Sequence, residues 1–89
     1  MKIDSSQPSV LFIKDNLTVA KEYQKVLKKE PVKLTHVETG ADALTYLQET
    51  TPAVILLDLG LPDMNGTTIL EYVRQQQLSS KVIVITVIQ

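Results

Sequence analysis

The stretch at residues 53–66, AVILLDLGLPDMNG, decides the fold of this chain. Its first five residues are apolar, and a short continuous run of this kind is typical of a strand buried on both faces of a sheet. The run ends at Asp58, so a carboxylate stands at the carboxyl end of the strand. Pro62, Asn65 and Gly66 are turn-forming residues, which predicts that a loop follows the acid.

Strands and helices are expected to alternate on both sides of this stretch. Further strands are predicted at residues 10–13, 32–37 and 82–88, and helices at residues 17–29, 39–49 and 67–77. Asn16 suits a helix N-cap, Thr39 and Asp42 have the spacing of a capping box, and Pro31 ends the first helix. The order βαβαβαβ predicts an α/β fold with a flavodoxin-like, doubly wound parallel sheet, incomplete because the order 2-1-3-4-5 has a fifth strand.

The composition fits one small globular domain. The chain has 89 residues, no cysteine and a net charge of −1, which leaves no disulfide, no thiolate metal site and no basic surplus for nucleic acid or an anionic membrane. Residues 1–9 are largely polar and are expected to form a flexible leader before a domain at residues 10–89. No stretch approaches the ~20 apolar residues that cross a bilayer, so we expect a cytoplasmic protein without membrane association.

Two acids are expected at one edge of the sheet. Asp15 follows the first strand and Asp58 ends the third, and these strands are neighbours in the predicted order. Close carboxylates attract a hard cation such as Mg²⁺, and a carboxylate beside Mg²⁺ can attack a phosphoryl group. The hydroxyl of Thr86 would then hydrogen-bond the acyl phosphate, and the backbone carbonyl of Gly60 would be a further metal ligand. A single acid after a strand is often only a turn or cap residue, so the prediction depends on the pair.

Three segments resemble the receiver domain of bacterial two-component response regulators, which is CheY-like in fold. They are IKDN at residues 13–16, ILLDLGLPDMNG at residues 55–66 and VIVIT at residues 82–86. The resemblance extends over nearly the whole chain from Val10 onward, and the segment around Asp58 is its most specific part. The sequence is also similar to receivers of NtrC-type and LuxO-type transcription regulators.

This resemblance implies a function and a set of site residues. Asp58 would be the phosphoacceptor, taking a phosphoryl group from a sensor histidine kinase or a phosphotransfer protein. Asp15, Asp58 and the backbone carbonyl of Gly60 would bind Mg²⁺, and Thr86 would be the switch hydroxyl. The output domain, which would bind DNA and regulate transcription, would lie outside this chain, and the module itself would not be an enzyme.

Two features depart from the receiver pattern. Lys14 stands where receivers carry the first of two adjacent acids, and its ammonium should weaken Mg²⁺ binding. Its side chain either pairs with Asp58 and imitates a neutralised state or points to solvent. The sequence ends at Gln89, so the receiver domain is expected to be partial, without the last helix, strand and helix and their lysine. The fourth strand, at residues 82–88, would then be an uncharged edge, which predicts self-association.

Two other functions stand beside the phosphorylated switch. One is a degenerate pseudo-receiver, a protein–protein interaction module that never takes a phosphoryl group, and Lys14 and the missing lysine favour it. The other is a phosphatase of the haloacid dehalogenase kind, which also uses an aspartate after a strand. That family has a second aspartate two residues further on, where this chain has Gly60, so this alternative ranks low.

Overall fold

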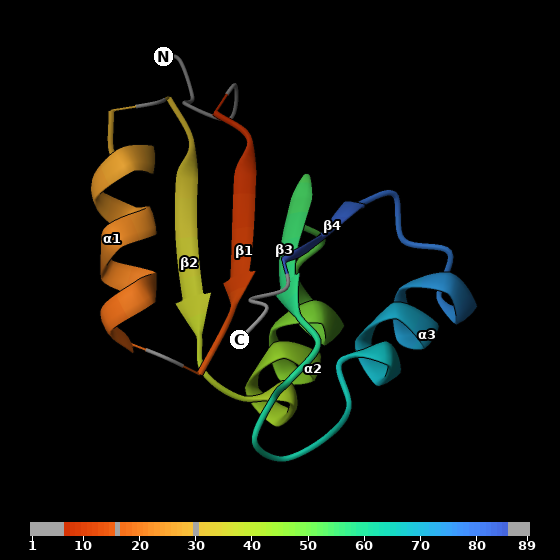
Figure 1. Ribbon diagram of the computed structural model, residues 1–89. Helices are drawn as coiled ribbons and strands as arrows, with labels where there is room; N and C mark the ends of the chain where they lie inside the picture. The colour runs from red at the N-terminus through yellow and green to blue at the C-terminus, as the bar shows by residue number, and fades with distance from the viewer. Residues whose placement is uncertain (1–6, 16, 30, 86–89) are drawn as a thin grey trace.

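The computed structural model describes residues 7–15, 17–29 and 31–85. Strands and helices follow one another in the predicted alternating order (Figure 1). The elements are β1 (Ser9–Ile13), α1 (Leu17–Leu27), β2 (Lys33–Val37), α2 (Gly40–Glu49), β3 (Val54–Asp58), α3 (Thr67–Gln75) and β4 (Lys81–Ile85). None of the helices in these described ranges is both long enough and apolar enough to span a membrane.

The strands form one parallel sheet in the order β2-β1-β3-β4. This order confirms the flavodoxin-like arrangement predicted from the sequence, with no fifth strand in the part of the chain that the structure describes. β1 and β3 are hydrogen-bonded neighbours, and Ile13 lies opposite Leu57. Since Lys14 follows Ile13 and Asp58 follows Leu57, these two residues reach the carboxyl edge of the sheet side by side.

Hydrophobic side chains are buried on both faces of the sheet, as expected for a doubly wound fold. One core lies between the sheet and the helices α2 and α3. Its buried members are Leu11, Ile13, Ala43, Leu47, Ile55, Leu57, Leu61, Ile69 and Val73. On the opposite face Phe12 is fully buried, and its ring lies 5.0 Å from the ring of Tyr23 in α1. Figure 1 shows α1 on the far side of β2 and β1 from α2 and α3.

The two clearest helix boundaries have local causes. α2 begins where the sequence predicts, because Thr39 Oγ1 accepts a hydrogen bond from the backbone N–H of Asp42 at 3.0 Å. α3 begins after Gly66, which is buried against the loop that precedes it. A Cβ at Gly66 would lie 2.6 Å from the Cα of Leu59, so only glycine fits this close approach.

α3 ends at Gln75 rather than at the predicted Gln77. Gln77 has φ 54°, in the left-handed region, and therefore cannot continue the helix. The backbone N–H of Leu78 donates to the carbonyl of Val73 at 3.0 Å, and that of Gln77 donates to the carbonyl of Arg74 at 3.1 Å. These two hydrogen bonds form a Schellman motif with glutamine in the place that glycine usually takes.

Four further predictions differ from the structure or lie outside the described residues. β1 begins at Ser9, inside the expected leader, and the Ser9 carbonyl accepts a hydrogen bond from Ala53 at 2.9 Å. α1 ends at Leu27, two residues before the predicted end. The predicted N-cap Asn16 and the last part of the fourth strand, residues 86–88, lie outside the described residues.

Candidate functional site

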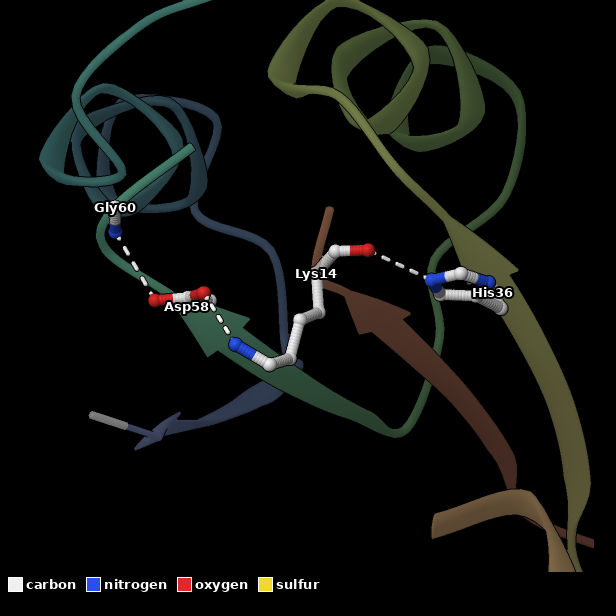
Figure 2. A network of polar contacts seen from close by, with 4 residues as sticks. All are labelled: Lys14, His36, Asp58 and Gly60. Carbon is white, nitrogen blue, oxygen red and sulfur yellow. Dashed lines mark hydrogen bonds and ion pairs between the residues drawn. The ribbon is translucent and has the colours of Figure 1, made fainter. Parts of the chain in front are cut away.

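Asp58 is the last residue of β3, and only 9% of its surface is exposed. Its Oδ1 accepts a hydrogen bond from the backbone N–H of Gly60 at 3.0 Å. Its Oδ2 accepts one from Nζ of Lys14 at 2.7 Å, which is also an ion pair (Figure 2). Both carboxylate oxygens of Asp58 therefore accept a hydrogen bond, one from the residue after β1 and one from the loop after β3.

Lys14 points inward and pairs with Asp58, which resolves the alternative left open by the sequence. Its residue exposure is 5%, so its side chain does not extend into solvent. Its backbone N–H donates to the carbonyl of Val37 at 3.1 Å, and its carbonyl contacts Nε2 of His36 at 2.7 Å. Lys14 is thus held by β2 through its backbone and by β3 through its side chain.

The charges around Asp58 favour its ionised form. Burial by itself raises the pKa of this carboxyl. The hydrogen bond from Lys14, the hydrogen bond from Gly60 and the charge of the Lys14 ammonium all lower it, and together they outweigh burial. The pKa of Asp58 is therefore held below its ordinary value, and the carboxylate stays charged at neutral pH.

His36 is a supporting residue that the sequence analysis missed. Residues of a half-exposed strand often face solvent, but His36 is half-buried, and its ring lies 5.6 Å from the ring of Phe12. A backbone carbonyl can only accept a hydrogen bond, so Nε2 of His36 donates to the carbonyl of Lys14. No local pattern in the sequence indicates this contact, because the two residues meet only when β1 and β2 pair.

The loop after Asp58 is closed by its own backbone and by one side chain. Gly66 N–H donates to the carbonyl of Leu59 at 2.9 Å, which brings the two ends of the loop together. The carboxylate of Asp63 accepts hydrogen bonds from the backbone N–H groups of Gly40 at 2.8 Å and Ala41 at 2.9 Å. These two hydrogen bonds hold the pKa of Asp63 below its ordinary value.

Asp63 therefore does more than shape the turn between Pro62 and Gly66. Its carboxylate accepts hydrogen bonds from N–H groups in the first turn of α2, which have no partner within the helix. These contacts tie the loop that follows Asp58 to that helix. Sequence spacing did not indicate this contact, because Asp63 lies 22 residues from Ala41.

Of the predicted magnesium ligands, Asp58 is paired with the ammonium of Lys14. Asp15 is exposed, and Gly60 reaches Asp58 through its N–H, not through its carbonyl. Within the described ranges no group of three or more acidic, histidine or cysteine residues could hold a metal ion. Mg²⁺ requires oxygen ligands, and here a cation already occupies Oδ2 of Asp58. The residues present do not fit Mg²⁺ while Lys14 stays in this position.

Thr86, the predicted switch hydroxyl, lies outside the described residues. The described part of β4 ends at Ile85, which is opposite Asp58 in the register of β3 and β4. The role of Thr86 and the binding of Mg²⁺ by Asp15, Asp58 and Gly60 stay predictions.

A parallel sheet of this order, with a buried aspartate at the end of its third strand, defines a class of signalling domain. A family model described as the response regulator receiver domain matches residues 10–89. The chain belongs to the response regulator receiver family. Domains of this family generally bind Mg²⁺, so Lys14 sets this chain apart from the usual pattern.

The chain is also similar in sequence to two named regulators. The luminescence regulatory protein LuxO of Vibrio campbellii is 35% identical over 74 residues, which are 83% of this chain and 16% of that protein. The DNA-binding response regulator MtrA of Mycobacterium tuberculosis is 32% identical over 72 residues, which are 81% of this chain and 32% of that protein.

A solved structure agrees with these sequence comparisons. The signal receiver domain of a LuxO-type repressor from Vibrio parahaemolyticus has a TM-score of 0.87 and 39% identity. The match covers 90% of this chain and 62% of that one. The similarity to LuxO-type receivers that the sequence indicated is thus confirmed, while the chain spans only a small part of the length of the regulators it matches.

Proposed function

We propose that this chain is the signal-receiving module of a two-component phosphorelay and that Asp58 is its phosphoacceptor. The observation that supports the proposal is the ionised, buried carboxylate at the carboxyl end of β3 in a member of the receiver family. The donor is the phosphohistidine of a sensor histidine kinase or of a phosphotransfer protein.

The transfer uses the groups that surround Asp58. A carboxylate oxygen attacks phosphorus, the P–O bond of an acyl phosphate forms, and the P–N bond to histidine breaks with its electron pair left on the imidazole. The ammonium of Lys14 and the N–H of Gly60 already donate to this carboxylate. These two donors could also bind oxygens of the incoming phosphoryl group.

The output of the switch belongs to a part of the protein beyond this chain. LuxO is a regulatory protein and MtrA is a DNA-binding response regulator. By analogy, we propose a DNA-binding output domain that regulates transcription. A module that receives its signal from a kinase and passes it to DNA works in the cytoplasm.

A second candidate function is favoured by one observation. The ammonium of Lys14 already balances the negative charge of Asp58. In a typical receiver, the charge at this aspartate changes when it takes a phosphoryl group. A pseudo-receiver of this kind would act as a protein–protein interaction module in a single fixed state.

Acetyl phosphate separates the two candidates. Intact-mass spectrometry of the 89-residue chain should show one added phosphoryl group, which hydroxylamine removes, as expected for an acyl phosphate. The variant Asp58→Asn, which keeps the side-chain volume, should gain none. A chain that stays unmodified under conditions that phosphorylate a typical receiver would exclude the phosphoacceptor role and leave the pseudo-receiver.

A further inference from the structure

The ion pair between Lys14 and Asp58 is shielded from solvent on both sides. The side-chain exposures are 7% for Lys14 and 12% for Asp58, and Nζ lies 2.7 Å from Oδ2. Pairs on the surface are weakened by water and salt, but a pair with this little exposure is screened far less. The two opposite charges therefore attract each other strongly, and at this contact distance no other ion fits between them.

We propose that the ammonium of Lys14 takes the place of the divalent cation at Asp58, so that this pocket does not bind Mg²⁺. The inference rests on the proposed function only in taking the Asp58 pocket to be the phosphoacceptor pocket. The charge on the carboxylate is balanced by the chain itself and does not depend on the metal content of the solution.

The backbone of Lys14 is anchored to β2, and its ammonium is held at Asp58 by the ion pair. Val37 fixes the N–H of Lys14 and His36 fixes its carbonyl, so the residue cannot turn without breaking contacts with β2. Figure 2 shows the side chain running from this anchored backbone across to Asp58 at the end of β3. If the side chain left, Asp58 would keep its negative charge in a buried site with only the N–H of Gly60 as partner.

A divalent ion could not bind beside the ammonium. It would have to approach Asp58 against a positive charge at contact distance, in a site where water screens little. The neighbouring acid, Asp15, is exposed, and the described residues contain no cluster of three potential ligands that would offset the repulsion. Metal binding therefore requires that Lys14 be removed or replaced.

Titration with Mg²⁺ tests the inference without any phosphorylation. In ¹H–¹⁵N spectra of the 89-residue chain, the chemical shifts of the Asp58 and Gly60 amides should show no saturable change as Mg²⁺ is added. In the variant Lys14→Asp, which restores an acid next to Asp15, they should shift saturably. The affinity measured by calorimetry should rise on the order of tenfold or more, because a repulsive charge becomes an attractive one.

Two matched variants make the result specific. Lys14→Met keeps the apolar stem but removes the charge, so it should bind Mg²⁺ more weakly than Lys14→Asp and more tightly than the original chain. It also serves as the test if Lys14→Asp does not fold. Adding Asp58→Asn to Lys14→Asp should remove the gained binding, which shows that the ion sits at Asp58.

The outcomes distinguish this inference from the proposed function. Saturable Mg²⁺ binding by the original chain, with shifts of the Asp58 and Gly60 amides, would overturn the inference even if Asp58 is phosphorylated. Binding confined to the Lys14 variants would support it. In that case a failure of acetyl phosphate to modify the original chain would count only against the phosphoacceptor role.

Discussion

The contact between Lys14 and Asp58 links the stability of the fold to the chemistry of the site. Removing one partner of a buried ion pair leaves the other charge without compensation. We expect Lys14→Met to lower the free energy of unfolding at pH 7 by about 3 kcal/mol. Urea denaturation followed by circular dichroism measures this loss, which is a large share of the roughly 5–15 kcal/mol typical of a domain.

The same pair makes stability depend on pH in a defined direction. The pKa of Asp58 is lowered in the folded chain, so its contribution is complete above the unfolded pKa of about 4 and is lost as the pH falls through the folded value. In Lys14→Met, burial dominates and the pKa of Asp58 should rise instead. The stability difference between the two proteins should therefore be constant near neutral pH and begin to shrink as the pH falls through the raised pKa of Asp58 in Lys14→Met. It should shrink further below about pH 4, where the original chain loses its own contribution.

A double-variant cycle separates the pair from other effects of the substitution. Lys14→Met combined with Asp58→Asn removes both charges, so it should recover part of the stability that either single change loses. Losses that simply add would show that the two side chains do not interact. A stability difference that stays the same at every pH would contradict the lowered pKa of Asp58.

The sequence predicted the proximity of Lys14 and Asp58 but not the direction of the lysine side chain. Proximity follows from the strand order, which the apolar runs and the resemblance both indicate. The direction of the Lys14 side chain is set by its contact with Asp58, and its backbone is held by Val37 and His36, two residues of another strand. The contacts of His36 and Asp63 were missed for the same reason, because they join residues far apart in the chain.

At the scale of the elements, the end of α3 holds a strained residue. Gln77 has φ 54°, where a residue with a side chain costs about 1 kcal/mol or more relative to glycine. We expect Gln77→Gly to raise the free energy of unfolding by about 1 kcal/mol. Chemical denaturation at neutral pH measures the gain, and the Mg²⁺ titration should not change.

The neighbouring residue provides the control for this substitution. Gln76 has φ −86° and ψ −2°, a right-handed conformation that any residue adopts. Gln76→Gly should therefore lower stability by roughly 0.5–1 kcal/mol, since glycine only adds freedom to the unfolded chain. If both glycine variants are equally destabilised, strain at Gln77 does not contribute.

The positions of the elements were predictable, and their ends were less so. Apolar runs located β1, β3 and β4, while β2 was located by the alternation of apolar and polar residues. Thr39 marked the start of α2 correctly, since a cap is a local signal. The end of α3 was predicted too late, because Gln77 gives no sign of its left-handed backbone in a run of three glutamines.

At the scale of the whole molecule, the described chain exposes apolar surface on both faces around β4. Ile83 is 46% exposed and Val84 is 41% exposed, and they point to opposite faces because they are adjacent in a strand. On the α1 face an open hollow of about 410 Å³ is lined mainly by Tyr23, Val26 and Leu56. Val26 is 68% exposed, so the apolar surface continues onto the helix.

β4 combines this surface with a free strand edge. Among the described residues it pairs only with β3 and so forms one edge of the sheet. An edge strand with apolar side chains is a template for pairing with another chain. We therefore propose that the 89-residue chain, studied alone, self-associates through β4.

Light scattering coupled to gel filtration should show a mass that rises with protein concentration. Ile83→Lys places a charge on the exposed strand and should shift the chain toward the monomer. Gln75→Lys, on the exposed surface of α3 and outside β4, also adds one positive charge and should leave the association unchanged. A constant monomeric mass over the whole concentration range would contradict the proposal. Equal dissociation by both variants would point to net charge, not β4, as the cause.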